Sequence, residues 1–360
     1  MKRQELIDSV AWDVRNALLG EVYASPKPGL VDRMNQGAHK DMDFETFQAS
    51  TDAITPYLTE MFLAGLDGVS IVQNQAAGFD PAMNYTEEES IFLSIRIIGM
   101  NAERAMFQST HGINTHKGMI FTMGIVLAAA GICYRTKGRI QAREVLDMTK
   151  RMTSRILEKE FQEMAAREPV THGEKLFHRF GEKGIRGQAE DGFPILADVA
   201  IPVLKKLNMS CGQKPVSMEV EDAAEAAAEA EGRLKELLSL EPEQDIREDI
   251  RQEMETNRTW KWKPMEGPLY QNAAYVYVLL SIMSVLDDTN VLNRGTPELL
   301  EAVKTQSREI LRCGALFTEE GYRKVMEFND FCVRENLSPG GAADILAVSI
   351  LLNRLERLTP

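Results

Sequence analysis

The segment from Gly37 to Ser50, GAHKDMDFETFQAS, gathers charged side chains immediately before an apolar period. In an extended chain Asp41 and Asp43 point to the same side, whereas on a helix they lie about 200° apart. Two carboxylates on one side of a chain can ligate Mg²⁺. The alternative is that Asp43 simply caps the helix that follows. The residue pattern leaves both interpretations open.

Five segments between apolar periods combine glycine with charged or amide side chains. Glycines allow main-chain amides to approach a ligand, and neighbouring basic side chains suit phosphate oxygens. Segments that only connect helices do not require this composition, so it indicates anion binding. The segments are 25–43, 111–119, 172–194, 287–295 and 338–344.

Two basic residues have local settings that favour an anion. Arg186 stands between glycines in GIRGQ, which suits a bidentate phosphate contact. Lys117 falls in the first turn of a predicted helix that Asn114 or Thr115 caps. A lysine there opposes the helix dipole by about a few tenths of a kcal/mol, so it favours an anion nearby. A solvated lysine is the plainer alternative.

The segment DDTNVLNRG (287–295) mixes acidic, amide and basic groups. Asp288 and Asn290 carry oxygen atoms of the kind that Mg²⁺ prefers, and Arg294 can pair with phosphate. This combination suits a metal ion bound together with a phosphate group.

SPGGAADILAV (338–348) places Gly340 and Gly341 just before a predicted helix, whose free N–H groups can bind an anion. Asp344, in the first turn, is explained by the helix dipole. The sequence has no GxxxxGK[ST] loop, no GxGxxG after a strand, no GxSxG elbow and no HExxH pair. The residues alone therefore predict a helical protein that binds a polyphosphate with a divalent metal.

Charge and hydropathy exclude several classes of protein. The 41 basic and 54 acidic residues give a net charge of −13, which argues against general nucleic-acid binding. The apolar runs 120–134 and 273–286 are shorter than the about 20 residues of a membrane span, so we expect core helices and no membrane partner. No signal peptide and no CxxC pair are present, and reduced thiols predict a cytoplasmic protein.

Helical periodicity dominates the chain, and no convincing run of period-two strands occurs. The first helix contains Leu6, Val10 and Val14 on one face and ends at the prolines of 25–30. Thr86 and Glu89 form a capping-box pattern ahead of another helix. We predict an all-α, multi-helix globular domain. Further helices are predicted at 119–135, 140–166, 221–239, 243–257, 270–286, 297–312, 319–335 and 342–357.

Residues 212–260 differ from the rest of the chain because they are rich in Ala and Glu and poor in large apolar groups. These residues are strong helix formers, so we predict an acidic helical hairpin that acts as an insertion or lid. The predicted organisation is one catalytic helical domain, formed by 1–211 and 261–360, with 212–260 inserted.

The polar segments together resemble the family of triphosphoribosyl-dephospho-coenzyme A synthases, which serve citrate lyase and malonate decarboxylase. The resemblance covers residues 24–347 in the family's order. It rests on ASPKPGLVDRMNQGAHKDMDFETF, GINTHKGMIF, HG followed by FGEKGIRGQAEDGFP, DTNVLNR, and SPGGAADILA. Three features depart from the family pattern: Gln188 replaces a common Glu, Ala342 replaces a common Ser, and the acidic segment is longer.

The resemblance implies that ATP and 3′-dephospho-CoA combine to give 2′-(5″-triphosphoribosyl)-3′-dephospho-CoA and adenine, with Mg²⁺ as cofactor. The product would pass to a transferase system that loads an acyl carrier protein. A homo-oligomer is compatible with the sequence, since an apolar helix face can be core or interface. Loss of adenine develops oxocarbenium character at C1′, so the reaction needs a carboxylate near the ribose and groups that transfer protons.

The resemblance assigns roles to residues of the polar segments. The catalytic candidates are Asp41, Asp43, His39, His116 and His172. The candidates for substrate binding are Lys27, Arg33, Lys117, Arg186, Arg294, Gly340 and Gly341. The candidate metal ligands are Asp32, Asp41, Asp43, Asp288 and Asn290.

Two other functions fit the residues. A metal-dependent nucleotide N-glycosidase would cleave the same ribosyl bond with water as acceptor, and it would need no dephospho-CoA. A non-catalytic, ATP-binding helical regulator would bind nucleotide without turnover and use the acidic hairpin to contact a partner.

Overall fold

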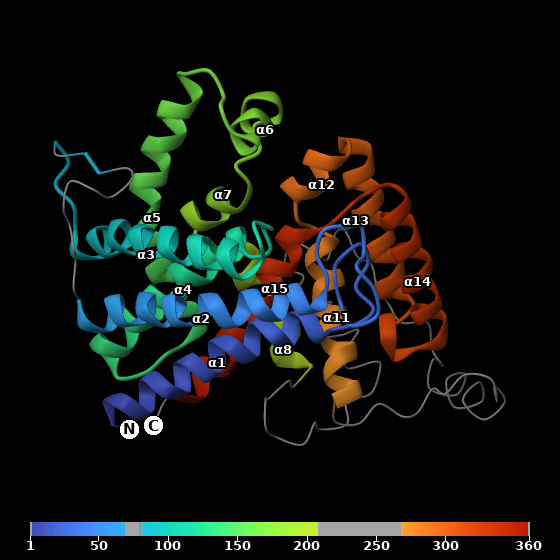
Figure 1. Ribbon diagram of the computed structural model, residues 1–360, viewed down its shortest axis with the longest axis horizontal. Coiled ribbons are helices and arrows are strands. Elements are labelled where there is room, and N and C mark those ends of the chain that lie inside the picture. Colours follow the sequence, from blue (N-terminus) through green and yellow to red (C-terminus); the bar gives the residue numbers. More distant parts are fainter. Residues whose placement is uncertain (1, 69–78, 81, 208–267, 359–360) are drawn as a thin grey trace. The chain divides into compact units, whose positions relative to one another are not determined.

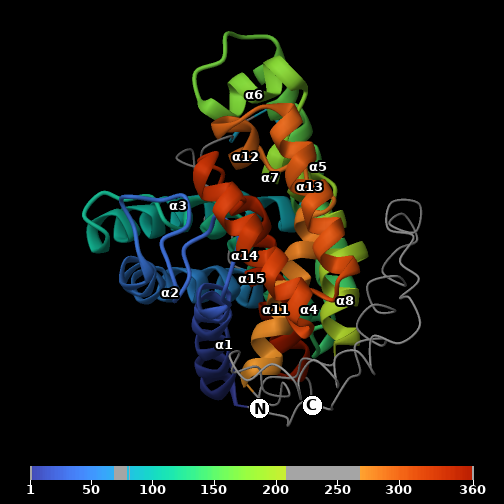
Figure 2. The same ribbon diagram turned by 90° about the vertical axis from the view of Figure 1, so that its right-hand side faces the viewer.

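The computed structural model describes residues 2–68, 79–80, 82–207 and 268–358. Figures 1 and 2 show helices joined by irregular connections, and the described residues contain no strand. The predicted all-α fold is therefore confirmed. The predicted acidic hairpin at 212–260 lies outside the described residues.

The chain divides into two compact units. Unit 1 comprises Met1–Gly20, Lys40–Ala197 and Ala347–Pro360, and unit 2 comprises Glu21–His39 and Asp198–Leu346. The boundary falls within helix α1 (Arg3–Tyr23) and within helix α15 (Gly340–Leu355). Each unit is therefore built from segments that lie far apart in the sequence.

Unit 1 consists mainly of long helices. Helices α4 and α5 lie close to the predicted ranges 119–135 and 140–166, and Thr86 caps α3 in the predicted capping box with Glu89. The helices wholly within this unit are α2 (Phe44–Asp67), α3 (Glu87–Ser109), α4 (Lys117–Lys137), α5 (Ala142–Ala165), α6 (His172–Phe180) and α7 (Gly184–Glu190).

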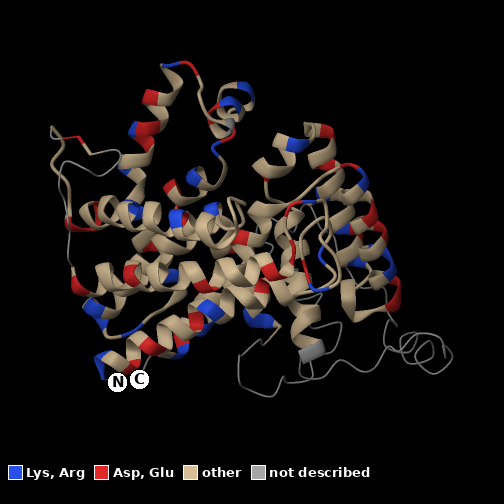
Figure 3. Ribbon diagram, viewed as in Figure 1, with Lys and Arg blue, Asp and Glu red and all other residues tan. Residues whose placement is uncertain are grey.

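Unit 2 contains α8 (Ile201–Lys206), α11 (Pro268–Met283), α12 (Thr289–Arg294), α13 (Pro297–Arg312) and α14 (Glu319–Arg334). Along α14 basic and acidic residues are interspersed (Figure 3), and ion pairs such as Arg323–Glu327 link successive turns. This helix has a mixed solvated face of the kind that amphipathic surface helices carry.

Two segments that the sequence interpretation treated as connections are helical. Residues 172–194 contain α6 and α7, and residues 287–295 contain α12. Thr171 and Glu174 form a capping box at the start of α6, and Gly181 ends the helix with φ of 75°. The prediction was wrong here because helices of six to nine residues are too short to display a clear apolar period.

Helices α2 and α4 approach closely because glycines face the partner backbone. A Cβ on Gly65 would lie 2.0 Å from the carbonyl oxygen of Ala128, and one on Gly131 would lie 2.2 Å from that of Phe62. Any larger side chain at either position would push the helices apart. These glycines therefore fix the spacing of α2 and α4.

Helix α4 is long and apolar enough to span a membrane by length and composition alone. The helix is 21 residues long, longer than the apolar run 120–134 on which the sequence interpretation relied. In the structure 78% of its apolar window is buried inside the protein. Its packing against neighbouring helices is that of the core helix expected from the sequence.

Buried hydroxyl groups recur along the helices of unit 1. Thr55 donates to the carbonyl oxygen of Thr51 (2.7 Å), and Thr59 donates to that of Thr55 (2.9 Å). Ser94 in α3 makes the same contact one turn back (2.8 Å). Each of these hydroxyls is thus satisfied by its own helix rather than by a neighbouring one.

Candidate functional site

Asp288 links the starts of two helices in unit 2. Its carboxylate caps α12 by accepting from the N–H of Asn290 (2.8 Å), and it also accepts from the N–H of Ala342 in α15 (3.0 Å). Burial raises the pKa of Asp288, although these N–H donors stabilise the charged form. The predicted segments 287–295 and 338–344 therefore meet at this residue.

The glycines at the start of α15 border the same two side chains. A Cβ on Gly341 would lie 3.0 Å from Oδ2 of Asp288, and a Cβ on Gly340 would lie 3.0 Å from Nδ2 of Asn290. Asn290 itself is exposed. A side chain at either glycine would crowd Asp288 or Asn290, so glycine keeps this first helical turn close to them.

His39, from the predicted segment 25–43, contacts both the segment 338–344 and α12. Its Nε2 is 2.9 Å from Oγ of Ser338, and its Nδ1 is 3.5 Å from Nη2 of Arg294. The guanidinium of Arg294 also donates to the carbonyl oxygen of Ala38 (3.4 Å), and this side chain is exposed. Unit 2 thus brings His39, Arg294 and the start of α15 into one group.

Asp344 lies among other carboxyl groups in unit 2. Burial, followed by the negative charges of Glu21 and Asp288, raises the pKa of Asp344 well above its ordinary value. Burial also raises the pKa of Glu21, against the opposing effect of Lys27. Acids in such a setting hold their protons to higher pH than exposed acids do.

Lys27 is buried in an ion pair. Its ammonium group donates to the carboxylate of Glu21 and to the main-chain carbonyl oxygen of that residue (2.8 Å). Asp32 accepts from the N–H groups of Lys27 (2.7 Å), Met34 (2.6 Å) and Asn35 (3.1 Å). Both side chains therefore hold the segment 25–35 in shape, and their roles toward phosphate and metal stay predictions.

Arg33 lies on the outside of the same segment. Its Nε donates to the carbonyl oxygen of Tyr23 (2.9 Å), and its guanidinium lies 5.5 Å from the centroid of the Tyr23 ring. The side chain is exposed. Its remaining N–H groups lie where a phosphate can approach from solvent.

Asp41 and Asp43 belong to unit 1, where Asp43 caps α2. The carboxylate of Asp43 accepts from the N–H (2.9 Å) and the hydroxyl (2.7 Å) of Thr46, and these bonds lower the pKa of Asp43. Asp41 is exposed. The helix-cap interpretation of Asp43 is thus confirmed, and the shared metal site stays a prediction.

His116 is buried at the start of α4. Its Nδ1 lies 2.6 Å from Oγ of Ser50, which also accepts from the hydroxyl of Thr115 (2.7 Å). The ring meets that of Phe47 edge to face, with centroids 5.0 Å apart. These contacts fix the imidazole between α2 and α4.

Lys117 follows His116 and is exposed. Its N–H donates to Oδ1 of Asn114 (3.2 Å), but the N-cap of α4 is His116, so the predicted cap at Asn114 or Thr115 is wrong. Its ammonium group pairs with Glu103 of α3 (3.0 Å). An anion that binds Lys117 would therefore compete with Glu103.

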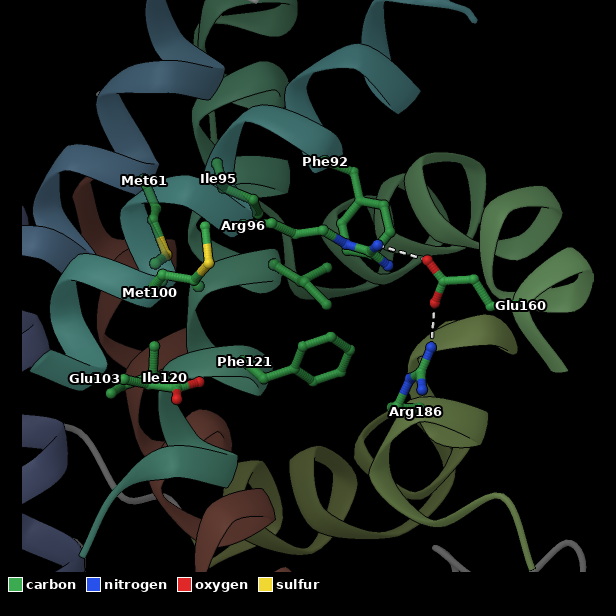
Figure 4. A pocket seen from close by; sticks show the side chains of 13 residues that line it. Met61, Phe92, Ile95, Arg96, Met100, Glu103, Ile120, Phe121, Glu160 and Arg186 are labelled. Carbon is green, nitrogen blue, oxygen red and sulfur yellow. Dashed lines mark hydrogen bonds and ion pairs between the residues drawn. The ribbon is translucent and has the colours of Figure 1, made fainter. Parts of the chain in front are cut away.

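Arg186 shares a carboxylate with a second arginine. Glu160 of α5 pairs with Arg186 of α7 and with Arg96 of α3 (2.5 Å), as Figure 4 shows. The Arg186 guanidinium also lies 5.4 Å from the Phe161 ring centroid. His172 is the first residue of α6 in the same unit.

The two substitutions relative to the family pattern have modest structural effects. Gln188 lies in α7, where its side-chain oxygen accepts from the N–H of Ile195 (3.4 Å). Ala342 contacts Asp288 through its main-chain N–H (3.0 Å), which any residue except proline supplies. Neither substitution removes a contact that joins the segments described above.

Sequence reasoning missed several members of these groups. Asp344 was explained by the helix dipole, and Glu21, Ser338, Glu103 and Glu160 received no role. Glu21, Glu103 and Glu160 lie inside predicted helices and outside the polar segments, so spacing gives no indication of them. Asp344 and Ser338 lie within SPGGAAD, and that motif was the one available signal.

The described residues contain no group of three or more His, Cys, Asp or Glu side chains arranged to hold a metal ion. Mg²⁺ that accompanies a nucleotide usually takes only one or two protein carboxylates, because phosphates and water complete its shell. Asp288 supplies one carboxylate and Asn290 one amide oxygen, and their role as metal ligands stays a prediction.

Comparison with known proteins gives matches over nearly the whole chain. A model of the family described as ATP:dephospho-CoA triphosphoribosyl transferase matches residues 7–217 and 208–360. A probable 2-(5″-triphosphoribosyl)-3′-dephosphocoenzyme-A synthase of Malonomonas rubra is 29% identical over 96% of this chain and 88% of its own. The synthase of that name from Klebsiella pneumoniae is 29% identical over 96% of this chain and 90% of its own.

A probable synthase of Salmonella gallinarum is 30% identical over 94% of this chain and 88% of its own length. No solved structure matches the chain. The fold and the sequence matches define a helical protein of a transferase family. The chain belongs to the ATP:dephospho-CoA triphosphoribosyl transferase family, which confirms the resemblance seen in its motifs.

Proposed function

We propose that this protein transfers the 5-triphosphoribosyl group of ATP to the 2′-hydroxyl of 3′-dephospho-CoA and releases adenine. The observation that carries the proposal is the family match, which covers residues 7–217 and 208–360. The relatives named above are synthases of the corresponding product.

The reaction breaks the bond between C1′ of the ATP ribose and N9 of adenine. The 2′-oxygen of the acceptor bonds to C1′, and the proton of its hydroxyl is balanced by the proton that adenine gains. The triphosphate stays intact. The protein must therefore hold the phosphates without presenting a nucleophile to phosphorus, and it must stabilise positive charge at C1′.

The group at the start of α15 suits the triphosphate. Arg294 exposes its guanidinium beside His39 in unit 2, whereas the carboxylate of Asp288 already accepts from the first-turn N–H of Ala342. Arg33 supplies a second exposed guanidinium from the segment 25–39. Guanidinium groups are effective partners of phosphate oxygens.

Two residues of the same unit are suited to proton transfer. Asp344, whose pKa is raised by burial and by the charges of Glu21 and Asp288, is our candidate for the acid that protonates adenine as the base leaves. His39, oriented by Ser338, is our candidate for the base that accepts the proton of the 2′-hydroxyl.

Mg²⁺ is a proposed cofactor, and Asp288 and Asn290 would hold it. When bound, the ion neutralises part of the charge of the triphosphate. The oxygen donors of these two side chains are the kind that Mg²⁺ prefers. The product would serve as the precursor of the acyl carrier prosthetic group of citrate lyase or malonate decarboxylase.

Adenine release separates this function from its alternatives. The purified protein is incubated with ATP and Mg²⁺, with and without 3′-dephospho-CoA, and adenine is measured by liquid chromatography. We expect release that depends on dephospho-CoA, together with an acceptor whose mass increases by one triphosphoribosyl group. Release without acceptor would identify a glycosidase, and binding of ATP without release would identify a regulator.

A further inference from the structure

Unit 1 contains a cavity of about 400 Å³ between α2, α3 and α4. Its wall is mainly apolar, and Figure 4 shows Met61, Ile95, Met100, Ile120 and Phe121 around it. Cavities of about this size accept ligands of the size of a drug molecule or cofactor. None of the site residues predicted from the sequence lies in the apolar part of this wall.

Glycines on two facing helices shape this wall, because Gly99 leaves space open and Gly124 leaves room that the Met61 side chain occupies. A Cβ on Gly99 of α3 would meet Met61 at 3.6 Å and Ile120 at 3.8 Å, which are ordinary contacts. A Cβ on Gly124 of α4 would lie only 2.2 Å from the sulfur atom of Met61. The flexible Met61 and Met100 side chains let this wall adapt to a chain of irregular outline.

One edge of the cavity carries excess positive charge. Arg96 and Arg186 share the single carboxylate of Glu160, so these three side chains sum to one positive charge. The exposed fractions of the arginine side chains are 15% and 35%, which leaves Arg186 in particular open to a ligand. An anionic group on the ligand would pair with both guanidiniums.

The opposite edge offers an acceptor. Glu103 lines the cavity on the side away from Glu160 (Figure 4), and Lys117 neutralises its charge. A carboxylate in this place can accept from amide N–H groups of a bound chain.

We propose that this cavity binds the pantetheine arm of the acceptor, with the adjoining phosphate at Arg96 and Arg186. The inference rests on the proposed function, which makes 3′-dephospho-CoA the acceptor. The arm is flexible, carries a gem-dimethyl group and two amides, and joins a pyrophosphate at one end. That order of groups matches the cavity, which has an adaptable apolar wall, a hydrogen-bond acceptor at one edge and paired guanidiniums at the other.

The first test measures binding without turnover. Isothermal titration with 4′-phosphopantetheine and with pantetheine uses the full chain, its Gly99→Leu variant and its Gln108→Leu variant. Gly99→Leu fills the cavity, whereas Gln108→Leu adds the same side chain at an exposed position of α3. We expect Gly99→Leu to weaken both probes about tenfold or more, and Gln108→Leu to bind like the wild type.

Arg186→Gln provides a second variant that keeps the apolar wall. It should weaken 4′-phosphopantetheine about tenfold to a hundredfold, because a hydrogen-bonded charge contact is lost, and it should leave pantetheine unchanged. Equal loss for both probes, or unchanged binding by a folded Gly99→Leu protein, would overturn the proposal. So would failure of the wild type to bind 4′-phosphopantetheine.

The second test uses turnover and separates this inference from the proposed function. ADP has the adenosine diphosphate of dephospho-CoA but lacks the arm. Where the wild type also transfers to ADP, we expect Gly99→Leu to lower kcat/KM for dephospho-CoA and to leave kcat/KM for ADP unchanged. Absence of transfer by the wild type would refute the proposed function. The binding measurements would still show whether the cavity binds the pantetheine arm. A loss of kcat/KM that is equal for both acceptors would count against the arm site.

Discussion

The ammonium group of Lys27 contacts the carboxylate of Glu21 inside unit 2, and the two side chains are only 1% and 5% exposed. Lysine in a motif rich in glycine and proline was predicted to bind phosphate. In the structure it neutralises an acid that lies close to Asp344. The pair holds the segment after α1 against the acidic group of unit 2.

Removal of one partner should leave a buried charge. We expect Lys27→Met to lower the free energy of unfolding by about 3–5 kcal/mol, because Glu21 loses its counter-ion. The double variant Glu21→Leu/Lys27→Met should recover most of this loss. Urea unfolding followed by circular dichroism measures both. A single variant as stable as the wild type, with a raised KM for ATP, would instead support the predicted phosphate contact.

Arg294 is exposed and lies beside His39, so its replacement should affect activity rather than folding. We expect Arg294→Ala to lower kcat/KM for ATP about tenfold to a hundredfold, the usual effect of one charge-assisted hydrogen bond. The Tm should change little. Arg312→Ala, which removes an exposed arginine at the end of α13, serves as the control. Equal activity of the two variants would exclude Arg294 from the phosphate site.

Two substitutions of Asp43 distinguish a structural role of this residue from a catalytic one. Asp43→Ala should cost about 1 kcal/mol of stability through loss of the cap of α2, whereas Asp43→Asn should retain the cap. If capping is its whole role, Asp43→Asn will turn over at the wild-type rate. A stable Asp43→Asn protein without activity would show that the charge itself is required, as the predicted metal or oxocarbenium role demands.

Gly131 tests the close packing of α2 and α4. Because its Cβ would lie 2.2 Å from the carbonyl oxygen of Phe62, Gly131→Ala should destabilise unit 1 by about 1–3 kcal/mol. Gly173→Ala in α6 is a suitable control, since its Cβ would meet nothing within 4 Å. Chemical denaturation of the two variants gives the comparison. Similar stabilities would mean that the two helices adjust their spacing at little cost.

Glu174 should make the stability of α6 depend on pH. The N–H groups of Val170 and Thr171, followed by Arg167, lower the pKa of Glu174 to about 2 from the ordinary 4.5. Its contribution to stability is therefore complete above about pH 4.5 and is lost as the pH falls toward 2. The Tm difference between the wild type and Glu174→Gln should be larger at about pH 7 than at about pH 3.5. A difference that stays constant would argue against this linkage.

The long helices were predictable because their apolar period repeats many times, as in α5, and because Thr86 and Glu89 mark the start of α3. The short helix α12 was not, since six residues show no period and its cap, Asp288, resembles a metal ligand. A side chain that caps a helix and a side chain that holds a cation are chosen from the same few residue types. Spacing alone does not distinguish them.

The motifs located part of the candidate site, and the fold supplied the rest. His39, Asp288 and Arg294 were named from the sequence and lie in one unit. Glu160, by contrast, sits in the middle of an ordinary amphipathic helix, and only the packing of α3, α5 and α7 reveals that it joins two arginines. Charge pairs between helices depend on three-dimensional neighbours, which a local pattern does not contain.

The buried hydroxyls of α2 and α3 have a consequence for how unit 1 can change over time. Thr55, Thr59 and Ser94 each donate a hydrogen bond to a carbonyl oxygen of their own helix. Replacement of any one of them by valine or alanine would therefore leave no unsatisfied hydrogen-bond partner on a neighbouring helix. Substitution at these positions therefore needs no compensating substitution elsewhere in the protein. These three positions can vary in polarity one at a time, whereas Gly65 and Gly131 can vary only together with the backbones that they face.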